Sequence, residues 1–286
     1  RIYYLQGSFE AALSAYNKVH ALKPEGSPEL WNNLGLLYAK MKRIDEAKDT
    51  YAKALNLRSA YTEVYYKLGL LSYKQNEFKK AQGYFEQAIT QRADYHQAYY
   101  NLGLVFSNQG ENEKAIEVYK KVLDITPDSV RVKLNLAVRY SKVKEYKQAQ
   151  AIYEEILEKD SSYFTAWLNL GLVYYSQKEY RLSQEALEKA VALEPESEKA
   201  YRALAKTYSA LKMHDEAIQI LRKLLNQNPS DVKTRLAYAR SYYRAKKRNT
   251  ALREYNKVLR LDPENEVAKK MIERIETKKR KKNETK

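Results

Sequence analysis

The stretch PELWNNLGLLYAKMKRIDEAKDTYAKALNLRSAY, residues 28–61, is one unit of the repeat that decides the fold. When the chain is written in rows of this length, equivalent positions fall 34 residues apart, and seven rows run without interruption over residues 28–265. A period of this size is typical of a solenoid, in which each unit buries its apolar face only by stacking on its neighbours. One column of the rows holds a large anchoring side chain: Trp31, Tyr65, Tyr99, Lys133, Trp167, Tyr201 and Arg235.

Each row predicts two helices. In residues 28–61 apolar side chains recur at helical spacing first around Trp31 and Leu34 and then around Ala47 and Tyr51. The chain has only 8 glycines and 6 prolines in 286 residues, which agrees with an all-α fold built from antiparallel helix pairs. Only small residues occupy the column where the two helices are expected to cross: Gly35, Gly69, Gly103, Ala137, Gly171, Ala205 and Ala239.

The two ends of the chain depart from the full rows. Residues 1–27 align with the later part of a row, so we expect a truncated first repeat and a chain that is a piece of something longer. Apolar residues in 266–277 fall on one face and predict a capping helix, which a solenoid needs to cover its last apolar surface. Residues 278–286 are basic and have no apolar periodicity, so they are predicted to be a disordered tail.

These columns resemble the tetratricopeptide repeat (TPR) signature over nearly the whole chain. The resemblance implies an α-solenoid coiled as a right-handed superhelix, with the first helix of each pair lining the concave face. Lys133 and Arg235 depart from the pattern by replacing the aromatic anchor, which is expected to weaken single contacts without breaking the register. One row carries the signature as Trp31, Leu34, Gly35, Tyr38, Ala47, Tyr51 and Ala54, and another as Tyr99, Leu102, Gly103, Phe106, Ala115, Tyr119, Val122 and Pro127.

The implied concave groove holds a mixture of polar and aromatic side chains. Asparagine recurs two residues after the anchor, which is similar to the asparagine ladder of O-linked N-acetylglucosamine transferase repeats. An amide side chain carries a donor and an acceptor, so such a ladder could pair with the backbone of an extended peptide; alternatively, it could hydrogen-bond only within the scaffold. The predicted groove residues are Asn32, Asn33, Tyr66, Lys67, Tyr100, Asn101, Asn135, Asn169 and Tyr175.

Another known groove chemistry is not expected here. The carboxylate clamp of chaperone-binding members of the family needs an asparagine five residues after an anchor. This chain has Leu36, Leu70, Leu104, Val138 and Leu172 at that position. Recognition of a chaperone C-terminus is therefore not predicted.

The positive charge of the chain is concentrated near its C-terminal end. The formal net charge is +16. Residues 1–197 hold 27 Lys and Arg against 25 Asp and Glu, whereas residues 198–286 hold 25 against 11. Such asymmetry favours an anionic ligand or an acidic portion of a partner at this end, although solvated surface charge is the alternative. The predicted anionic-ligand patch, with no acid among its members, is Lys199, Arg202, Lys206, Lys233, Arg240 and Arg244.

The sequence lacks the signatures of an enzyme. It has no cysteine, no GxxxxGK[ST] or GxGxxG phosphate loop and no HExxH motif, so we predict no catalytic residue, metal site or cofactor. No apolar run is long enough to predict a transmembrane segment. The compartment, cytoplasmic or periplasmic, and the oligomeric state stay open.

The interpretation that these features favour is a non-enzymatic scaffold for protein–protein interaction, which binds an extended peptide or partner segment in its concave groove. Two alternatives remain. The first is binding of RNA or another nucleic acid through the basic end, where tyrosines could stack on unpaired bases. The second is a targeting appendage of a larger enzyme.

Overall fold

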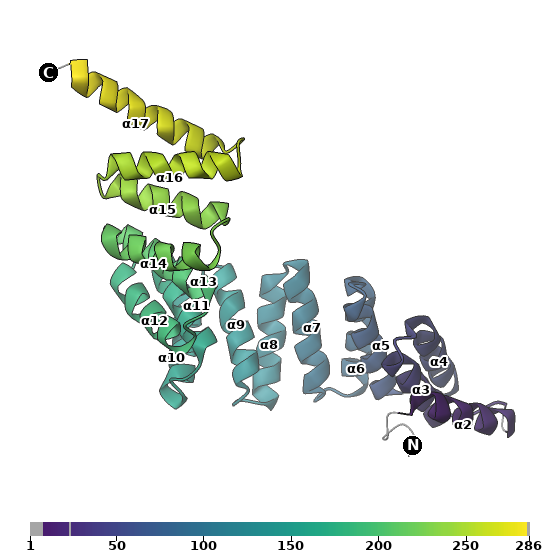
Figure 1. The fold of residues 1–286 in the computed structure, drawn as a ribbon. Coiled ribbons are helices and arrows are strands. Elements are labelled where there is room, and N and C mark those ends of the chain that lie inside the picture. Colours follow the sequence, from purple (N-terminus) through teal and green to yellow (C-terminus); the bar gives the residue numbers. More distant parts are fainter. Residues whose placement is uncertain (1–7, 23, 285–286) are drawn as a thin grey trace. The chain divides into compact units, whose positions relative to one another are not determined.

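The structure, a computed structural model, describes residues 8–22 and 24–284, and every regular element within them is an α-helix (Figure 1). This confirms the predicted all-α class. The sixteen helices are α2 Phe9–Leu22, α3 Pro28–Lys40, α4 Ile44–Leu57, α5 Thr62–Lys74, α6 Phe78–Gln91, α7 His96–Gln109, α8 Asn112–Ile125, α9 Val130–Lys142, α10 Tyr146–Lys159, α11 Phe164–Ser176, α12 Tyr180–Leu193, α13 Glu198–Ala210, α14 His214–Gln227, α15 Val232–Arg244, α16 Arg248–Leu261 and α17 Glu266–Glu284.

Helices that are consecutive in the sequence pack side by side, as the rows predict. The pairs α3 with α4, α5 with α6 and α7 with α8 belong to a first compact unit, which extends to Lys144. The pairs α11 with α12, α13 with α14 and α15 with α16 belong to a second unit, which begins at Glu145. The boundary falls inside the fourth row, between α9 and α10.

The small-residue column lies directly against the second helix of its own pair. A Cβ atom added to Gly35 would lie 2.6 Å from the ring of Tyr51, and one added to Gly69 would lie 2.6 Å from the ring of Phe85. Both rings are almost completely buried. Because real Cβ atoms do not approach other atoms so closely, only a residue of minimal size lets the two helices reach this separation.

A left-handed residue ends the first helix of each pair. Lys42 has φ 61° and Gly110 has φ 80° at equivalent positions. The following N–H then bonds back across the helix end, as from Arg43 to the Tyr38 carbonyl at 2.9 Å, which is the pattern of a Schellman cap. Gly110 is the only glycine in this column, whose other members with positive φ are Lys42, Asn76, Lys144, Lys178, Lys212 and Lys246.

Three anchors, Trp31, Trp167 and Arg235, donate a hydrogen bond to a carbonyl six residues upstream. Trp167 Nε1 donates to Ser161 O at 2.9 Å, and Arg235 Nη2 donates to Pro229 O at 2.6 Å. The other terminal nitrogen of Arg235 pairs with Glu254 at 2.9 Å, where both side chains are largely buried. Arginine therefore keeps the hydrogen bond of the tryptophan that it replaces and adds an ion pair.

Helix α17 covers the end of the second unit. Ala268 and Ile275 are buried, and Met271 and Ile272 pack against the same core, as expected for a cap. Val267 is 39% exposed. The helix continues to Glu284, where the sequence predicts a disordered tail from residue 278. Lysine, arginine and glutamate are good helix formers, and no glycine or proline follows to end the helix. The last two residues of the predicted tail, 285–286, lie outside the described residues.

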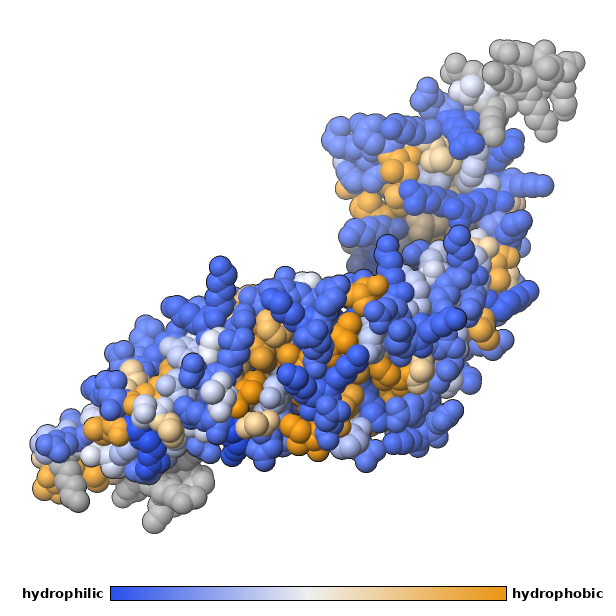
Figure 2. All heavy atoms as spheres, turned by 180° about the vertical axis from the view of Figure 1, so that it is seen from behind, coloured by the Kyte–Doolittle hydropathy of each residue, from blue (hydrophilic) through white to orange (hydrophobic). Residues whose placement is uncertain are grey.

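The surface mixes polar and apolar residues. On the face drawn in Figure 2, hydrophobic residues appear between hydrophilic ones. Several of the exposed large hydrophobic side chains are the last residues of second helices, namely Leu57, Ile125, Leu193 and Leu261. These three leucines and the isoleucine are spaced two repeats apart in the sequence, because the helices between them end in Gln91, Lys159 and Gln227.

Two helical glycines of the first unit should respond to alanine in opposite ways. Gly69→Ala should lower the free energy of unfolding by roughly 1–3 kcal/mol, because the new methyl group meets the Phe85 ring. Gly83→Ala, in α6, should raise it by about 1 kcal/mol, since nothing lies within 4 Å and alanine favours the helix. Urea unfolding followed by circular dichroism measures both, and shifts of the same sign would contradict the packing described.

The left-handed turns make a second prediction for the first unit. Lys42→Gly should raise the free energy of unfolding by about 0.5–1 kcal/mol, and Gly110→Lys should lower it by about 1–2 kcal/mol, because a side chain is unfavourable at positive φ. Both positions belong to the same column, so each variant is the control for the other in denaturant melts. A neutral result for Gly110→Lys would show that the turn changes conformation at little cost.

Candidate functional site

The first unit contains a hollow of about 700 Å³ on the side of its first helices. Side chains of α5 and α7 form one wall, and the α8–α9 loop with the start of α9 forms the other. We call it the first-unit groove. Three predicted groove residues, Tyr66, Tyr100 and Asn101, line it, together with His96, Gln97, Val122, Thr126, Pro127, Asp128, Ser129, Arg131 and Val132.

Hydrogen bonds between successive repeats fix the asparagines of this unit. Asn101 Nδ2 donates to the Tyr66 hydroxyl at 3.2 Å, and Asn135 Nδ2 donates to the Tyr100 hydroxyl at 3.0 Å. Asn101 Nδ2 also donates to the Gln97 carbonyl at 2.8 Å. These 35-residue rungs support the scaffold alternative for the amide nitrogens. Within the part of the chain that the structure describes, nothing donates to the amide oxygen of Asn101 or Asn135.

Asn32, one residue before the asparagine column, is bonded at both ends of its amide. Asn32 Nδ2 donates to the Tyr61 hydroxyl at 3.1 Å, and Lys67 Nζ donates to Asn32 Oδ1 at 2.8 Å. Asn32 is only 9% exposed, so it offers a ligand little surface. Asn33 is exposed and Asn169, in the second unit, is half-buried.

Burial and a cation act on the two tyrosines of this groove. Burial raises the pKa of Tyr66, although the hydrogen bond from Asn101 and the charge of Arg131 act in the opposite direction. The guanidinium of Arg131 also lies over the ring of Tyr100, 4.2 Å from its centroid. A raised pKa favours the protonated hydroxyl of Tyr66, which accepts the hydrogen bond from Asn101.

The second unit contains a larger hollow of about 820 Å³, which we call the second-unit pocket. Helices α11, α13 and α15 and the start of α14 supply its walls. Five of the six predicted patch residues line it, whereas Lys199 does not. The predicted groove residue Tyr175 lines this pocket and not the first-unit groove. Its basic and aromatic residues are Tyr175, Arg202, Lys206, Lys212, His214, Lys233, Arg240 and Arg244.

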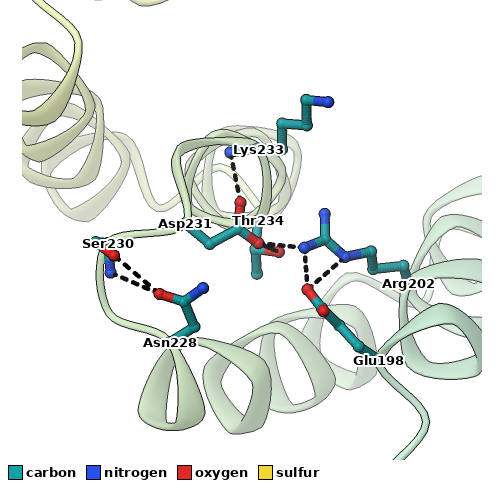
Figure 3. Close-up of polar contacts among 7 residues, drawn as sticks. All are labelled: Glu198, Arg202, Asn228, Ser230, Asp231, Lys233 and Thr234. Atoms are coloured by element: carbon teal, nitrogen blue, oxygen red, sulfur yellow. Dashed lines mark hydrogen bonds and ion pairs between the residues drawn. The ribbon is translucent and has the colours of Figure 1, made fainter.

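The prediction that no acid lies among these cations is wrong for Arg202. Figure 3 shows its guanidinium between the carboxylates of Glu198 and Asp231, with which it forms ion pairs. Burial opposes ionisation of Asp231, but hydrogen bonds from Thr234 and the charge of Arg202 hold the pKa of this carboxyl below its usual value. Asp231 begins α15 as its N-cap, so Arg202 joins two repeats instead of facing a ligand freely.

The other cations of the pocket differ from Arg202. Among the described residues, Lys206, Lys212, Lys233, Arg240 and Arg244 have no carboxylate partner. The Lys206 ammonium instead lies over the ring of Tyr175, 4.3 Å from its centroid. The positive charge of this pocket is therefore largely uncompensated.

Sequence reasoning missed Lys212 and His214. Lys212 lies in the turn between α13 and α14 and His214 begins α14, so neither belongs to the first helices that the resemblance places in the groove. Burial, together with Arg244 and Lys212, lowers the pKa of His214, while Asp215 and Glu216 act in the opposite direction. His214 Nδ1 is buried and has no hydrogen-bond partner in the described chain. The imidazole is therefore neutral at pH 7.

The described residues hold neither a metal-ligand cluster nor a membrane-spanning helix. They contain no cluster of three or more His, Asp or Glu side chains that could hold a metal ion. None of their helices is both long enough and apolar enough to cross a membrane.

Family profiles match successive parts of the chain. Tetratricopeptide repeat profiles match residues 27–94, 66–130 and 107–171, and a TPR repeat profile matches residues 1–42. Residues 154–268 match the profile described as the cytochrome c-type biogenesis protein H TPR domain. The chain is a tetratricopeptide repeat protein. No curated protein matches this TPR chain in sequence.

Solved structures share its fold. YrrB, described as a TPR protein with an unusual peptide-binding site, aligns with a TM-score of 0.60 and 21% identity over 66% of this chain and 97% of its own. A TPR protein from Parabacteroides merdae aligns with a TM-score of 0.65 and 16% identity over 87% and 98%. MamA aligns with a TM-score of 0.52 and 30% identity over 56% and 92%. These likenesses show a shared fold.

The environment of His214 predicts a pH effect on stability. Its pKa is lower in the folded chain than in the unfolded one, so the unfolded chain binds more protons as the pH falls through about 6.5. Stability from this residue is therefore present above that pH and lost below it. Melting temperatures measured between roughly pH 7.5 and 5.5 should fall less steeply for His214→Asn than for the wild type. Equal slopes would show that His214 does not contribute.

Proposed function

We propose that this TPR protein is a non-enzymatic interaction scaffold that binds an extended segment of a partner in the first-unit groove and an anionic portion of that partner in the second-unit pocket. The observation that carries the proposal is the pair of rungs from Asn101 to Tyr66 and from Asn135 to Tyr100. Each rung uses the amide nitrogen in the scaffold and leaves the amide oxygen without a partner.

The first rung would give the groove a fixed acceptor in Asn101, and the second would add Asn135 beyond the residues that line it. Both hydrogens of Asn101 Nδ2 are used, one by Tyr66 and one by the Gln97 carbonyl, so the side chain cannot rotate without losing them. Its oxygen is therefore held in one direction before any ligand arrives, which lowers the entropy lost on binding. An extended peptide has backbone N–H groups free to donate, because it makes no internal hydrogen bonds.

Other residues of the groove fit the same ligand. The rings of Tyr66 and Tyr100 supply apolar surface, and Gln97 is exposed beside them and carries both a donor and an acceptor. These groups could contact the backbone and small side chains of a peptide, so binding would not require one particular peptide sequence. The likeness in fold to YrrB, described as having a peptide-binding site, is in keeping with this use of a TPR groove.

The test uses two matched pairs of substitutions. Peptides are first selected from a random library on the intact chain, and their affinities are then measured by fluorescence anisotropy. Asn101→Ala with Asn135→Ala should weaken binding by about tenfold or more, because each removes one acceptor whose hydrogen bond is worth about 0.5–1.5 kcal/mol.

The control is Tyr66→Phe with Tyr100→Phe, which breaks the same rungs and keeps the amide oxygens. This variant should lose less affinity than the alanine variant, because the acceptors remain although the rungs no longer hold them in place. If both double variants lose stability equally and neither changes affinity, the asparagines serve the scaffold alone and the groove proposal is wrong.

A further inference from the structure

We propose that the second-unit pocket recognises a phosphorylated side chain on the partner segment, with Arg240 and Arg244 as the principal ligands of the phosphoryl group. This inference rests on the proposed function, since it names the chemistry of the anionic portion that the pocket binds. Three features of the pocket support it: several cations without a carboxylate partner, their origin on separate elements, and the small side chains that line the pocket with them.

The number of free cations favours a ligand with more than one negative charge at a single point. Lys206 comes from α13, Lys212 from the turn after it, and Lys233, Arg240 and Arg244 from α15. None of them has a carboxylate partner among the described residues, although Arg202 beside them has two. One carboxylate would leave most of this charge uncompensated. A phosphoryl group carries about −1.5 to −2 charges near neutral pH and has three acceptor oxygens.

The arrangement of the cations also fits a compact anion. Arg240 and Arg244 lie four residues apart on α15, so their side chains leave the same face of the helix. Guanidinium groups bind phosphoryl oxygens through paired hydrogen bonds, which a lysine cannot reproduce. Between them the lining is small, with Ala237 and Ser241 on the same helix, so the arginines have room to close on a ligand.

The lining offers an anion few competing donors. The Ser209 hydroxyl donates to the Ala205 carbonyl at 2.9 Å and the Ser241 hydroxyl to the Ala237 carbonyl at 3.0 Å. Both hydroxyl protons are therefore used by the backbone of their own helices. Recognition is left to the charged side chains, which would give high selectivity for charge and little for the neighbouring sequence.

The same residues argue against a nucleic acid. Single-stranded nucleic acids bind proteins through bases stacked on aromatic rings. Tyr175 is the only aromatic ring that lines the described pocket apart from the imidazole of His214. The Lys206 ammonium lies over one face of Tyr175, and the tilted ring of Tyr180 lies 5.3 Å from it, so this single tyrosine is poorly placed to stack on a base. A run of acidic residues is also a weaker fit, because its charges are spread along the chain.

The experiment measures binding of one neutral peptide sequence in three forms, which carry a phosphoserine, a serine or a run of glutamates at the same place. Fluorescence anisotropy is read with the full chain at physiological ionic strength. The phosphoserine peptide should bind most tightly, and Arg240→Gln with Arg244→Gln should weaken it at least about tenfold. Arg253→Gln with Arg260→Gln changes the charge equally on exposed residues of α16 outside the pocket, and should have less than about a threefold effect.

The outcomes separate this inference from the proposed function. If the glutamate peptide binds as tightly as the phosphoserine peptide, the phosphoryl inference is overturned and an anionic partner segment still stands. If neither binds, both are overturned for this pocket. Equal losses in the two double variants, or binding of single-stranded RNA that the phosphopeptide does not displace, would also overturn it. Lys206→Gln with Lys233→Gln repeats the test should the arginine variant fail to fold.

Discussion

The separation of the two helices in each pair is the constraint on which this molecule depends. Gly35 against Tyr51 and Gly69 against Phe85 bring two backbones as close as one ring allows. The ring fills the space that the missing side chain leaves, so the contact is both tight and apolar. Because each repeat touches only its neighbours, this local fit must be made again in every row. The surface residues are free to vary as long as the fit is kept.

That constraint explains how much of the fold could be predicted from sequence. A small residue facing a large one at fixed spacing is visible in the chain itself, so the paired helices and their order were predicted correctly. The end of the chain was not, because the sequence of residues 278–284 lacks an apolar face but still favours a helix. The division into two compact units within the fourth row left no sign in the sequence.

The candidate sites show a different limit. Five of the six predicted cations do gather in one pocket, because first-helix positions one repeat apart face the same side. Their partners could not be predicted. The pairing of Arg202 with Asp231 depends on how the loop before α15 places its N-cap, and the bond from Asn101 to Tyr66 joins different columns of adjacent rows. Such contacts depend on the direction in which each side chain points, which the aligned sequence of the repeats does not specify.

In the seventh row the anchor is Arg235, which holds its repeat together through an ion pair. Five of the other six anchors are aromatic rings, whose packing hardly responds to dissolved ions, and the sixth is Lys133. At Arg235 a largely buried guanidinium and the carboxylate of Glu254 share the task, and Lys257 binds the same carboxylate from outside at 2.8 Å. The terminal units of a solenoid are the first to open, since they have a neighbour on one side only. The stability of the repeat that carries Arg240 and Arg244 therefore depends on salt concentration. Its affinity for anions depends on salt for the same reason, because both rest on interactions between charges.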